Sequence, residues 1–394
     1  MNILYFCDRN ISPLMGGTER ITISVSNALR TIYGIKSFLA FVEDNIEIEP
    51  AFFDGRIRID ENLKSNDILK FINQNQITHI IVQNSFMRVN YFRSIIGKSS
   101  NVKIIFCYHF APGWDLHFDI SSQVKKIWRK PGAKNKIFAI LKYFYFSVAV
   151  PIRNIKYPSL YRKAYNHADK VVLLSDKFID GYKHFARLIS TKKICGIPNM
   201  LSFPDFLPES DISSKRKNVL IVARLDEEQK RISYALKVWR IVKQDKRSKD
   251  WRLQIIGSGD NEKDYKNYVE KYNLDSIEFL GRQNPSPYYK KASIFMLTSR
   301  SEGWGLTLTE SQQFGVVPVA FYSYESLVDI IDSGKNGYII KDEDILSYAE
   351  KILELMDNNE LRNNMARNAI NSAHRFEQSV IAHKWKDLFE KING

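Results

Sequence analysis

Two glutamates, Glu302 and Glu310, are separated by seven residues and lie around a glycine-rich turn. The apolar run before them predicts a strand that ends at Thr298, and Gly303 and Gly305 precede a short predicted helix. Glycines at such a turn let a ligand approach the backbone, and the helix N-terminus offers unpaired N–H groups to a phosphate. One carboxylate then lies in the loop and the other in the helix, so the two could bind different parts of one long ligand.

Glu310 also has a purely structural interpretation. Thr307-x-x-Glu310 has the spacing of a capping box, in which the two side chains satisfy backbone N–H groups at a helix start. Such a box alone would explain the glutamate. On these residues by themselves, the ligand and the capping interpretations both stay open.

Two basic residues follow another predicted strand, at residues 218–223. A guanidinium at the position of Arg224 can bind phosphate oxygens in a bidentate manner, and Lys230 adds a second positive charge. The alternative is that both form ordinary salt bridges with the acidic residues at 226–228. The spacing alone does not decide between a phosphate site and a surface ion pair.

Candidate positions in the first half are Gly16, Gly17, His109 and Asn199. A glycine pair that opens a helix can form an anion-binding loop or a simple turn. His109 follows a predicted strand at 102–108, where a histidine can face a ligand or serve a structural role. Asn199 follows Ile197 and Pro198, and turn chemistry explains an asparagine there equally well.

The elements that position these residues alternate between strands and helices along the whole chain. In the first half, short and continuously apolar runs predict parallel strands covered on both faces, at residues 2–6, 37–42, 77–82, 102–108 and 170–174. The alternation repeats in the second half, with strands at 218–223, 251–256, 277–280, 294–298 and 317–321. We therefore predict an α/β protein with two Rossmann-like domains that face a cleft.

The composition places the boundary between the two domains. Residues 201–217 contain two prolines, four serines and a charge cluster, which is typical of a linker. We predict an N-terminal domain at 1–200 and a C-terminal domain at 218–375. We expect a last helix, at 376–394, to pack back towards the first domain.

The overall composition is that of a globular protein with an uneven charge. The chain has 394 residues, of which 26% are charged and 44% apolar, and its formal net charge is +14. Residues 1–200 carry this whole excess, which favours an anionic partner on that half. Three cysteines fit neither a disulfide scaffold nor a zinc pattern, and we expect neither a secretory signal nor a membrane-spanning helix.

Taken together, the motifs resemble those of the GT4 family of retaining glycosyltransferases, which have the GT-B fold. Glu302 to Glu310 matches the E-x7-E motif of that family, and Met15-Gly16-Gly17-Thr18-Glu19 resembles its glycine-rich loop. Further landmarks are VLIVARLDEEQK at 219–230, IIGSGD at 255–260, IEFLGR at 277–282 and GKNGYII at 334–340. The likeness covers nearly the whole chain and is stronger in the second half. Lys230 stands one residue further from Arg224 than is commonest in the family.

The resemblance implies a role for each of these residues. Arg224, Lys230 and the Gly16–Gly17 backbone would stabilise the departing diphosphate, and His109 would contact the donor sugar and phosphate. Glu310 would bind the ribose hydroxyls, and Glu302 the sugar hydroxyls. The donor-binding residues that it implies are Gly16, Gly17, Arg282, Gly303, Trp304, Gly305, Leu306, Thr307 and Glu310, and the catalytic ones are Glu302, Arg224, Lys230 and His109.

Neither a metal nor a cofactor is expected, because the reaction needs only the nucleotide-sugar as donor substrate. Gly257-x-Gly259 lacks the third glycine and the later acidic partner of a dinucleotide fingerprint. Asp342-Glu343-Asp344 matches an Asp-x-Asp metal motif in form, but it opens a predicted helix and is interpreted as a solvated charge cluster.

Residues 120–168 combine basic and aromatic side chains and contain no Asp or Glu. Such a stretch, centred on 125–163, suits an interfacial segment on an anionic membrane leaflet. The alternative is a buried helix with a basic rim. Nucleic acid is not expected as a partner, because no nucleic-acid-binding motif accompanies the stretch.

The sequence thus predicts a retaining, metal-independent enzyme of polysaccharide or lipopolysaccharide synthesis, peripheral on the cytoplasmic face of the membrane. It would transfer a hexose or an N-acetylhexosamine from a UDP-sugar to a glycan or glycolipid acceptor. Two alternatives stay open: a nucleotide-sugar epimerase or hydrolase of the same fold, and a non-catalytic protein that binds nucleotides or polyanions.

Overall fold

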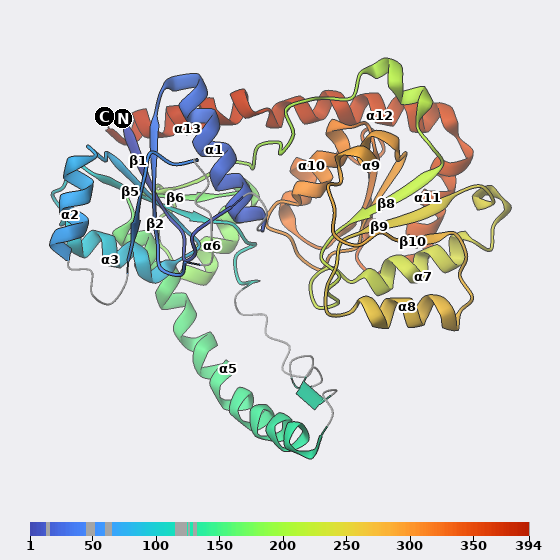
Figure 1. The fold of residues 1–394 in the computed structure, drawn as a ribbon, viewed down its shortest axis with the longest axis horizontal. Coiled ribbons are helices and arrows are strands. Elements are labelled where there is room, and N and C mark those ends of the chain that lie inside the picture. Colours follow the sequence, from blue (N-terminus) through green and yellow to red (C-terminus); the bar gives the residue numbers. More distant parts are fainter. Residues whose placement is uncertain are drawn as a thin grey trace. The chain divides into compact units, whose positions relative to one another are not determined.

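A computed structural model describes residues 1–12, 16–44, 52–59, 65–114, 124, 127–128 and 132–393 (Figure 1). The chain divides into two compact units. Unit 1 consists of Met1–Pro198 together with Ala382–Gly394, and unit 2 is Asn199–Ile381. Met15 of the predicted glycine-rich loop lies outside the described residues.

Unit 1 is built on a seven-stranded sheet in the order β3-β2-β1-β4-β5-β6-β7, and every neighbouring pair is parallel. The central strands have apolar and buried interior residues, as expected when helices cover both faces of a sheet. The strands are β1 (Asn2–Phe6), β2 (Lys36–Phe41), β3 (Gly55–Arg58), β4 (His79–Gln83), β5 (Lys103–Tyr108), β6 (Lys170–Leu173) and β7 (Ile194–Gly196).

Helices connect the strands of unit 1, as parallel pairing requires. They are α1 (Gly17–Tyr33), α2 (Ser65–Gln74), α3 (Phe86–Ile96), α5 (Ala133–His167) and α6 (Ile179–Ala186). Helix α1 ends at Gly34, which adopts the left-handed conformation and donates its N–H to the Arg30 and Leu29 carbonyls. Helix α5 has 35 residues, and its N-terminal part projects from the body of unit 1 (Figure 1).

Unit 2 contains a six-stranded sheet in the order β10-β9-β8-β11-β12-β13, again parallel throughout. Its strands are β8 (Asn218–Val222), β9 (Arg252–Ile256), β10 (Ile277–Phe279), β11 (Ile294–Leu297), β12 (Val317–Tyr322) and β13 (Tyr338–Lys341). Its helices are α7 (Ile232–Val242), α8 (Glu262–Lys271), α9 (Ser286–Lys291), α10 (Leu306–Gln313), α11 (Ile345–Asp357) and α12 (Asn359–Ala373). The fold class predicted from the sequence is confirmed, with two parallel α/β sheets.

The boundaries of the units differ from those predicted. The segment 201–217 is part of unit 2, where the Gln313 side chain donates to the Phe203 and Asp205 carbonyls at 2.8 Å each. The last helix, α13 (Gln378–Asn393), begins in unit 2, and its residues from Ala382 belong to unit 1. Proline and serine content alone could not reveal that the segment 201–217 packs against a buried glutamine.

No helix in the described part of the chain combines the length and the apolar character needed to cross a membrane.

Candidate active site

The candidate site of unit 2 lies at the carboxyl ends of β8 and β11. The strand order reverses at these two neighbours, because β9 and β10 extend the sheet on one side and β12 and β13 on the other. Ligands of open parallel sheets bind at such a switch point. Arg224 stands two residues beyond β8, and the loop that carries Glu302 follows β11.

Gln229 joins the two loops at this edge. The Arg224 guanidinium donates to Gln229 Oε1 at 3.0 Å, and Gln229 Nε2 donates to the Ser301 carbonyl at 3.2 Å. The Gln229 carbonyl also accepts from the Arg300 N–H at 2.7 Å. Sequence reasoning missed this residue, although an amide between Arg224 and Lys230 was a usable signal. Gln229 therefore positions Arg224 against the Glu302 loop.

Lys230 forms an ion pair with Glu302, and both side chains are largely buried. Glu302 Oε1 also accepts from the Ser299 hydroxyl at 2.7 Å. The alternative in which Lys230 forms a salt bridge with a neighbouring acid is wrong for Asp226 and Glu227, because Lys230 pairs with Glu302 and these two acids have other partners. Asp226 accepts from the Gln229 N–H, and Glu227 accepts from Ser233 and from the Tyr265 hydroxyl.

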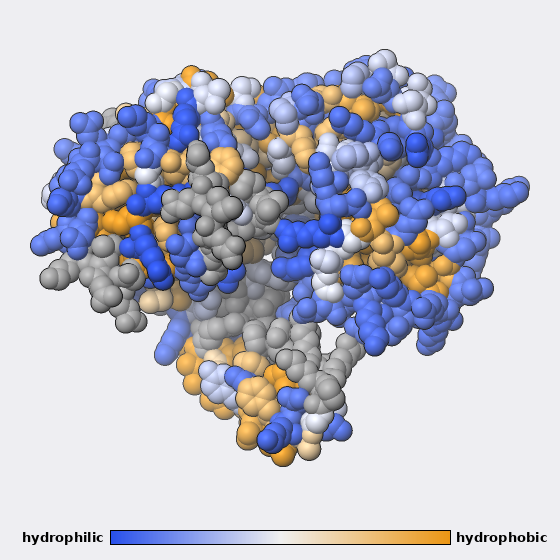
Figure 2. Space-filling view, in the orientation of Figure 1, coloured by the Kyte–Doolittle hydropathy of each residue, from blue (hydrophilic) through white to orange (hydrophobic). Residues whose placement is uncertain are grey.

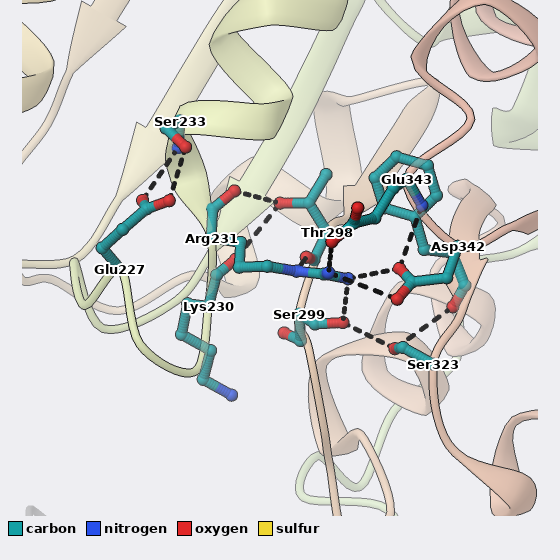
Figure 3. Close-up of polar contacts among 10 residues, drawn as sticks. Glu227, Lys230, Arg231, Ser233, Thr298, Ser299, Ser323, Asp342 and Glu343 are labelled. Carbon is teal, nitrogen blue, oxygen red and sulfur yellow. Dashed lines mark hydrogen bonds and ion pairs between the residues drawn. The ribbon is translucent and has the colours of Figure 1, made fainter. Parts of the chain in front are cut away.

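Arg231 is a buried arginine that the sequence analysis did not single out (Figure 3). Its side chain is 1% exposed, and its backbone is left-handed at φ 47°, which is uncommon for a residue with a side chain. The guanidinium donates to the Thr298 carbonyl at 3.0 Å, to the Ser299 carbonyl at 3.2 Å and to Asp342 at 2.5 Å. Figure 3 shows the Lys230 amine pointing away from this network. The Arg231 contacts thus join the N-terminus of α7 to the ends of β11 and β13.

Glu310 lies within α10 and is 1% exposed. The capping-box interpretation is wrong, because the N-cap of α10 is Gly305 and Thr307 is the second residue of the helix. Glu310 Oε2 accepts from the Tyr289 hydroxyl at 3.1 Å. Tyr289, on α9, is fully buried and stacks on Phe314. Tyr289 is therefore a positioning residue for Glu310 that sequence reasoning did not find.

The turn between Glu302 and α10 needs its glycine. Gly305 has φ +88°, and a Cβ there would come within 2.9 Å of the Tyr324 hydroxyl. Trp304 is buried edge-on against the Phe376 ring. Among the predicted donor-binding residues, Trp304 could thus contact a ligand only through its backbone, whereas Gly303, Leu306 and Thr307 keep partly exposed surfaces.

The loop after β9 lies directly against the loop that carries Arg224. A Cβ on Gly257 would lie 1.8 Å from the Ala223 carbonyl oxygen, so only glycine fits at this point. The Gly257 N–H donates to the Gly281 carbonyl at 2.8 Å, next to the exposed Arg282. The structure thus brings the predicted landmarks Arg224, Gly257 and Arg282 to one edge of the sheet.

Unit 1 brings its own predicted residues together at the ends of β4 and β5. His109 Nε2 donates to Gln83 Oε1 at 2.6 Å, because the Gln83 amide nitrogen already donates to the Thr22 hydroxyl at 3.1 Å. The Thr22 hydroxyl donates to the Thr18 carbonyl at 2.8 Å, in the first turn of α1. Gly16 is the N-cap of α1 and Gly17 its first residue, and both are exposed.

The hydrogen-bond chain fixes the state of His109. Desolvation by the surrounding atoms lowers the pKa of His109 to about 4, so the ring is neutral at pH 7. Its Nε2 carries the proton, which leaves Nδ1 as an acceptor. Gln83 and Asn84, whose side chain accepts from the His109 N–H at 2.8 Å, were missed by sequence reasoning. Two polar residues directly after a buried strand were the available signal.

The Asp342–Asp344 segment has structural roles. Asp342 pairs with Arg231, and Asp344 caps α11 by accepting from the Ser347 N–H at 3.0 Å. The interpretation of Asp342 as a solvated charge is therefore wrong. Over the described ranges of the chain, no three His, Cys, Asp or Glu side chains converge in a way that could hold a metal ion.

Comparison with known proteins gives the family of this site. Residues 202–372, which include Arg224, Glu302 and Glu310, match the family described as Glycosyl transferases group 1. The match covers the second sheet and its helices, so this part of the chain is similar to that family. The predicted resemblance to bacterial glycosyltransferases is thereby confirmed.

Curated relatives match about half of this chain, and solved structures match its fold over the whole length. An uncharacterized glycosyltransferase of Haemophilus influenzae is 30% identical over 185 residues, which are 46% of this chain and 52% of that protein. A Campylobacter jejuni N-acetylgalactosaminyltransferase, whose name specifies an undecaprenol-linked glycan, is 24% identical over 60% of this chain and 64% of its own. The chain thus spans less than two thirds of either relative.

The pneumococcal O-GlcNAc transferase GtfA, solved with UDP and GlcNAc, superposes with a TM-score of 0.71 at 14% identity, over 100% of this chain and 99% of its own. This likeness shows the fold alone. The predicted GT-B fold is therefore confirmed for the chain as a whole.

Proposed function

We propose that the protein is a glycosyltransferase of glycan biosynthesis that uses a nucleotide-sugar donor, UDP-linked, to transfer a hexose or an N-acetylhexosamine. One observation carries the proposal. Arg224, Lys230 and Glu302 meet at the switch point of the second sheet, within the region that matches the glycosyltransferase family. This is where a parallel sheet binds its ligand.

The chemistry of the site suits a diphosphate leaving group. Arg224 and Lys230 can each form charge-assisted hydrogen bonds, worth about 1.5–3 kcal/mol apiece, with the phosphate oxygens. Bonds that strengthen as charge develops on the leaving group accelerate the reaction. Glu302, released from Lys230 by the phosphate, can then accept from the sugar hydroxyls.

The finer mechanism follows from the family resemblance. We propose a retaining transfer that needs neither a metal nor a cofactor, because two cations and backbone N–H groups can neutralise the diphosphate. The acceptor hydroxyl would attack the sugar on the same face from which the diphosphate leaves. The leaving phosphate would take the proton of that hydroxyl. No protein base is required in this scheme. His109, neutral and with Nδ1 as an acceptor, would receive a hydrogen bond from a donor hydroxyl.

The acceptor is proposed to be lipid-linked or part of a lipopolysaccharide. The undecaprenol-linked glycan in the name of the Campylobacter relative supports an acceptor of this class. The excess positive charge of residues 1–200 supports an anionic surface as the place of reaction. We place the protein at the cytoplasmic face of the membrane, held there through residues 125–163. Lys125, Lys126, Arg129 and Lys130 of that stretch lie outside the described residues.

A donor screen with a lipid-linked acceptor extract tests the function. Arg224→Ala should lower turnover by about tenfold to a hundredfold, since 1.36 kcal/mol of lost transition-state stabilisation is a factor of ten. Arg252→Ala is the matched control, because Arg252 is an exposed arginine of unit 2 on β9, paired with Glu278. Hydrolysis or epimerisation of the donor without transfer would favour a nucleotide-sugar hydrolase or epimerase of the same fold. Nucleotide binding without turnover of any donor would favour a non-catalytic protein.

A further inference from the structure

The projecting part of α5 exposes apolar and aromatic side chains around its circumference, and six of the apolar ones form a continuous stripe. Six residues follow one another at spacings of three or four, so they lie on one face of the helix. They are Ile137, Leu141, Phe144, Val148, Ile152 and Ile155, here called the α5 stripe. Each is between 47% and 78% exposed. Figure 2 shows this hydrophobic surface on the part of unit 1 that projects from its body. A contiguous apolar face of this kind marks an interaction site.

Positive charge accompanies the stripe along its whole length. Helix α5 contains seven Lys or Arg residues and no Asp or Glu. Lys134, Lys136 and Lys156 are exposed. The Lys142 ammonium lies 5.2 to 5.5 Å from the ring centroids of Phe138, Tyr145 and Phe146. At 100° per residue, Lys136, Lys142 and Lys156 fall outside the stripe, and Lys134 lies in line with it, one turn before Ile137.

The charge pattern decides which partner the stripe fits. The spacing would also suit the seam of a coiled coil with a second copy of the chain. In such a pair, however, lysines and arginines would face only one another, because α5 offers no acidic residue. An anionic lipid surface satisfies both features, since its headgroups attract the lysines and its acyl boundary takes the apolar side chains.

We propose that the α5 stripe inserts into the headgroup and acyl boundary of an anionic membrane, with α5 lying parallel to the surface. From Ile137 to Ile155 the stripe extends about 27 Å along the helix. Lysines beside the stripe remain at the headgroup level, where long basic side chains keep their charge in contact with water and phosphate. The inference deepens the proposed function and rests on it for its purpose, which is to hold the enzyme where a lipid-linked acceptor is found.

Vesicle sedimentation of the full chain tests the insertion. The wild type should pellet with vesicles of phosphatidylglycerol and phosphatidylethanolamine and stay in solution with phosphatidylcholine alone. The triple variant Leu141→Ser, Phe144→Ser, Val148→Ser should lose about tenfold or more of its vesicle affinity, because apolar burial supplies the insertion energy. Its matched control is Met87→Ser, Ile189→Ser, Leu346→Ser, which removes three equally exposed apolar side chains elsewhere and should bind as the wild type does.

A second pair of variants tests the charge. Changing Lys134, Lys136 and Lys142 to Gln should also weaken binding by about tenfold or more. The control changes Lys249, Lys263 and Lys384 to Gln. These three lysines are exposed and lie outside α5, so the control variant should bind vesicles as the wild type does. If the lysine variant fails to bind while the stripe variant binds normally, the protein adsorbs by charge alone and insertion is refuted. Insertion is also refuted if duplex DNA displaces the protein completely from the vesicles and the stripe variant binds them as well as the wild type does.

Two further measurements separate the remaining outcomes. Sedimentation velocity without lipid should give the same mass for the wild type and the stripe variant. A dimer that dissociates in the stripe variant would make a second copy of the chain the partner and overturn the proposal. Transfer to a short soluble acceptor should be unchanged in the stripe variant. Vesicle binding without transfer to any acceptor would contradict the proposed function but leave the insertion standing.

Discussion

At the scale of single residues, the ion pair between Lys230 and Glu302 is the contact with which the proposed diphosphate would compete. Without ligand, Lys230 and Ser299 together satisfy the Glu302 carboxylate. A diphosphate that binds Lys230 must compete with that carboxylate, which then becomes available to a sugar hydroxyl. Glu310 takes no part in this exchange, because its carboxylate lies within α10 and accepts a hydrogen bond from Tyr289 on α9.

The two glutamates should therefore respond differently to loss of charge. Glu302→Gln should tighten the binding of free UDP by a few-fold, because Lys230 is released, and should reduce transfer. Glu310→Gln should weaken UDP binding by about tenfold, because the expected charge-assisted contact with the ribose hydroxyls is lost. Calorimetric titration of UDP on both variants measures the difference. An equal loss of affinity in the two would contradict the division of roles.

Arg231 should support turnover without touching the substrate. Arg231→Lys keeps the charge but replaces the separate guanidinium nitrogens that reach Thr298, Ser299 and Asp342 with a single nitrogen. The Thr298–Ser299 backbone therefore loses part of its support. We expect UDP affinity and turnover to fall by about tenfold, with the fold retained. Asp342→Asn should give a similar but smaller loss. Asp344→Asn is the control, because asparagine caps a helix as well as aspartate does. Wild-type turnover in Arg231→Lys would refute the positioning role.

At the scale of elements, the functional residues stand at the ends of buried strands. These strands were predictable because a short, continuously apolar run in an α/β chain is typical of a strand covered on both faces. The Arg224 and Glu302 loops were predictable from their motifs. The contacts of Gln229, Arg231 and Tyr289 were not, since each depends on a carbonyl or carboxylate that is distant in the sequence. Strands β3, β7 and β13 are short edge or near-edge strands, which carry too little pattern to be recognised.

The contact between the β8 and β9 loops should be intolerant of any side chain at residue 257. Gly257→Ala places a Cβ against the Ala223 carbonyl, so the Arg224 loop must move or the unit must lose stability. We expect a loss of roughly 3 kcal/mol or more in urea unfolding, together with weaker UDP binding. Gly334→Ala is the matched control, because Gly334 also has a positive φ but nothing lies within 4 Å of its Cβ position. It should cost only about 1 kcal/mol. Equal losses in the two variants would show that backbone strain alone is responsible.

At the scale of the whole molecule, the two units have similar sheet topologies. They differ in the charge of their surfaces and in the pKa values of their buried histidines. Alternating strands and helices predicted both sheets. The projection of α5 was not predictable, because Pro151 and Pro158 interrupt its pattern and yet lie inside the helix. The positive charge of α5 belongs to unit 1, as do His79 and His109, whose pKa values burial lowers to about 4.

Those histidines should make unit 1 the acid-sensitive part of the molecule. Desolvation lowers the pKa of each to about 4, and for His79 the N-terminal amine and Lys103 add to the shift while Asp169 opposes it. Between pH 6.5 and about 4 the unfolded chain binds these protons and the folded unit does not, so stability falls as the pH falls through this window. For the fully buried His79 alone the loss is roughly 3 kcal/mol, at 1.36 kcal/mol per pKa unit.

Hydrogen exchange resolved to single segments measures this loss. Corrected for intrinsic rates, the protection of β4 and β5 should decline from pH 6.5 to pH 4, while β8 and β9, in unit 2, should change far less. Replacing both histidines with Gln should flatten the decline in unit 1, because no group of shifted pKa then remains at those two positions. A decline of equal size in both units, unchanged in the double variant, would assign the acid sensitivity to carboxylates common to the two. A decline confined to unit 1 and removed by the double variant would identify the two buried imidazoles as its cause.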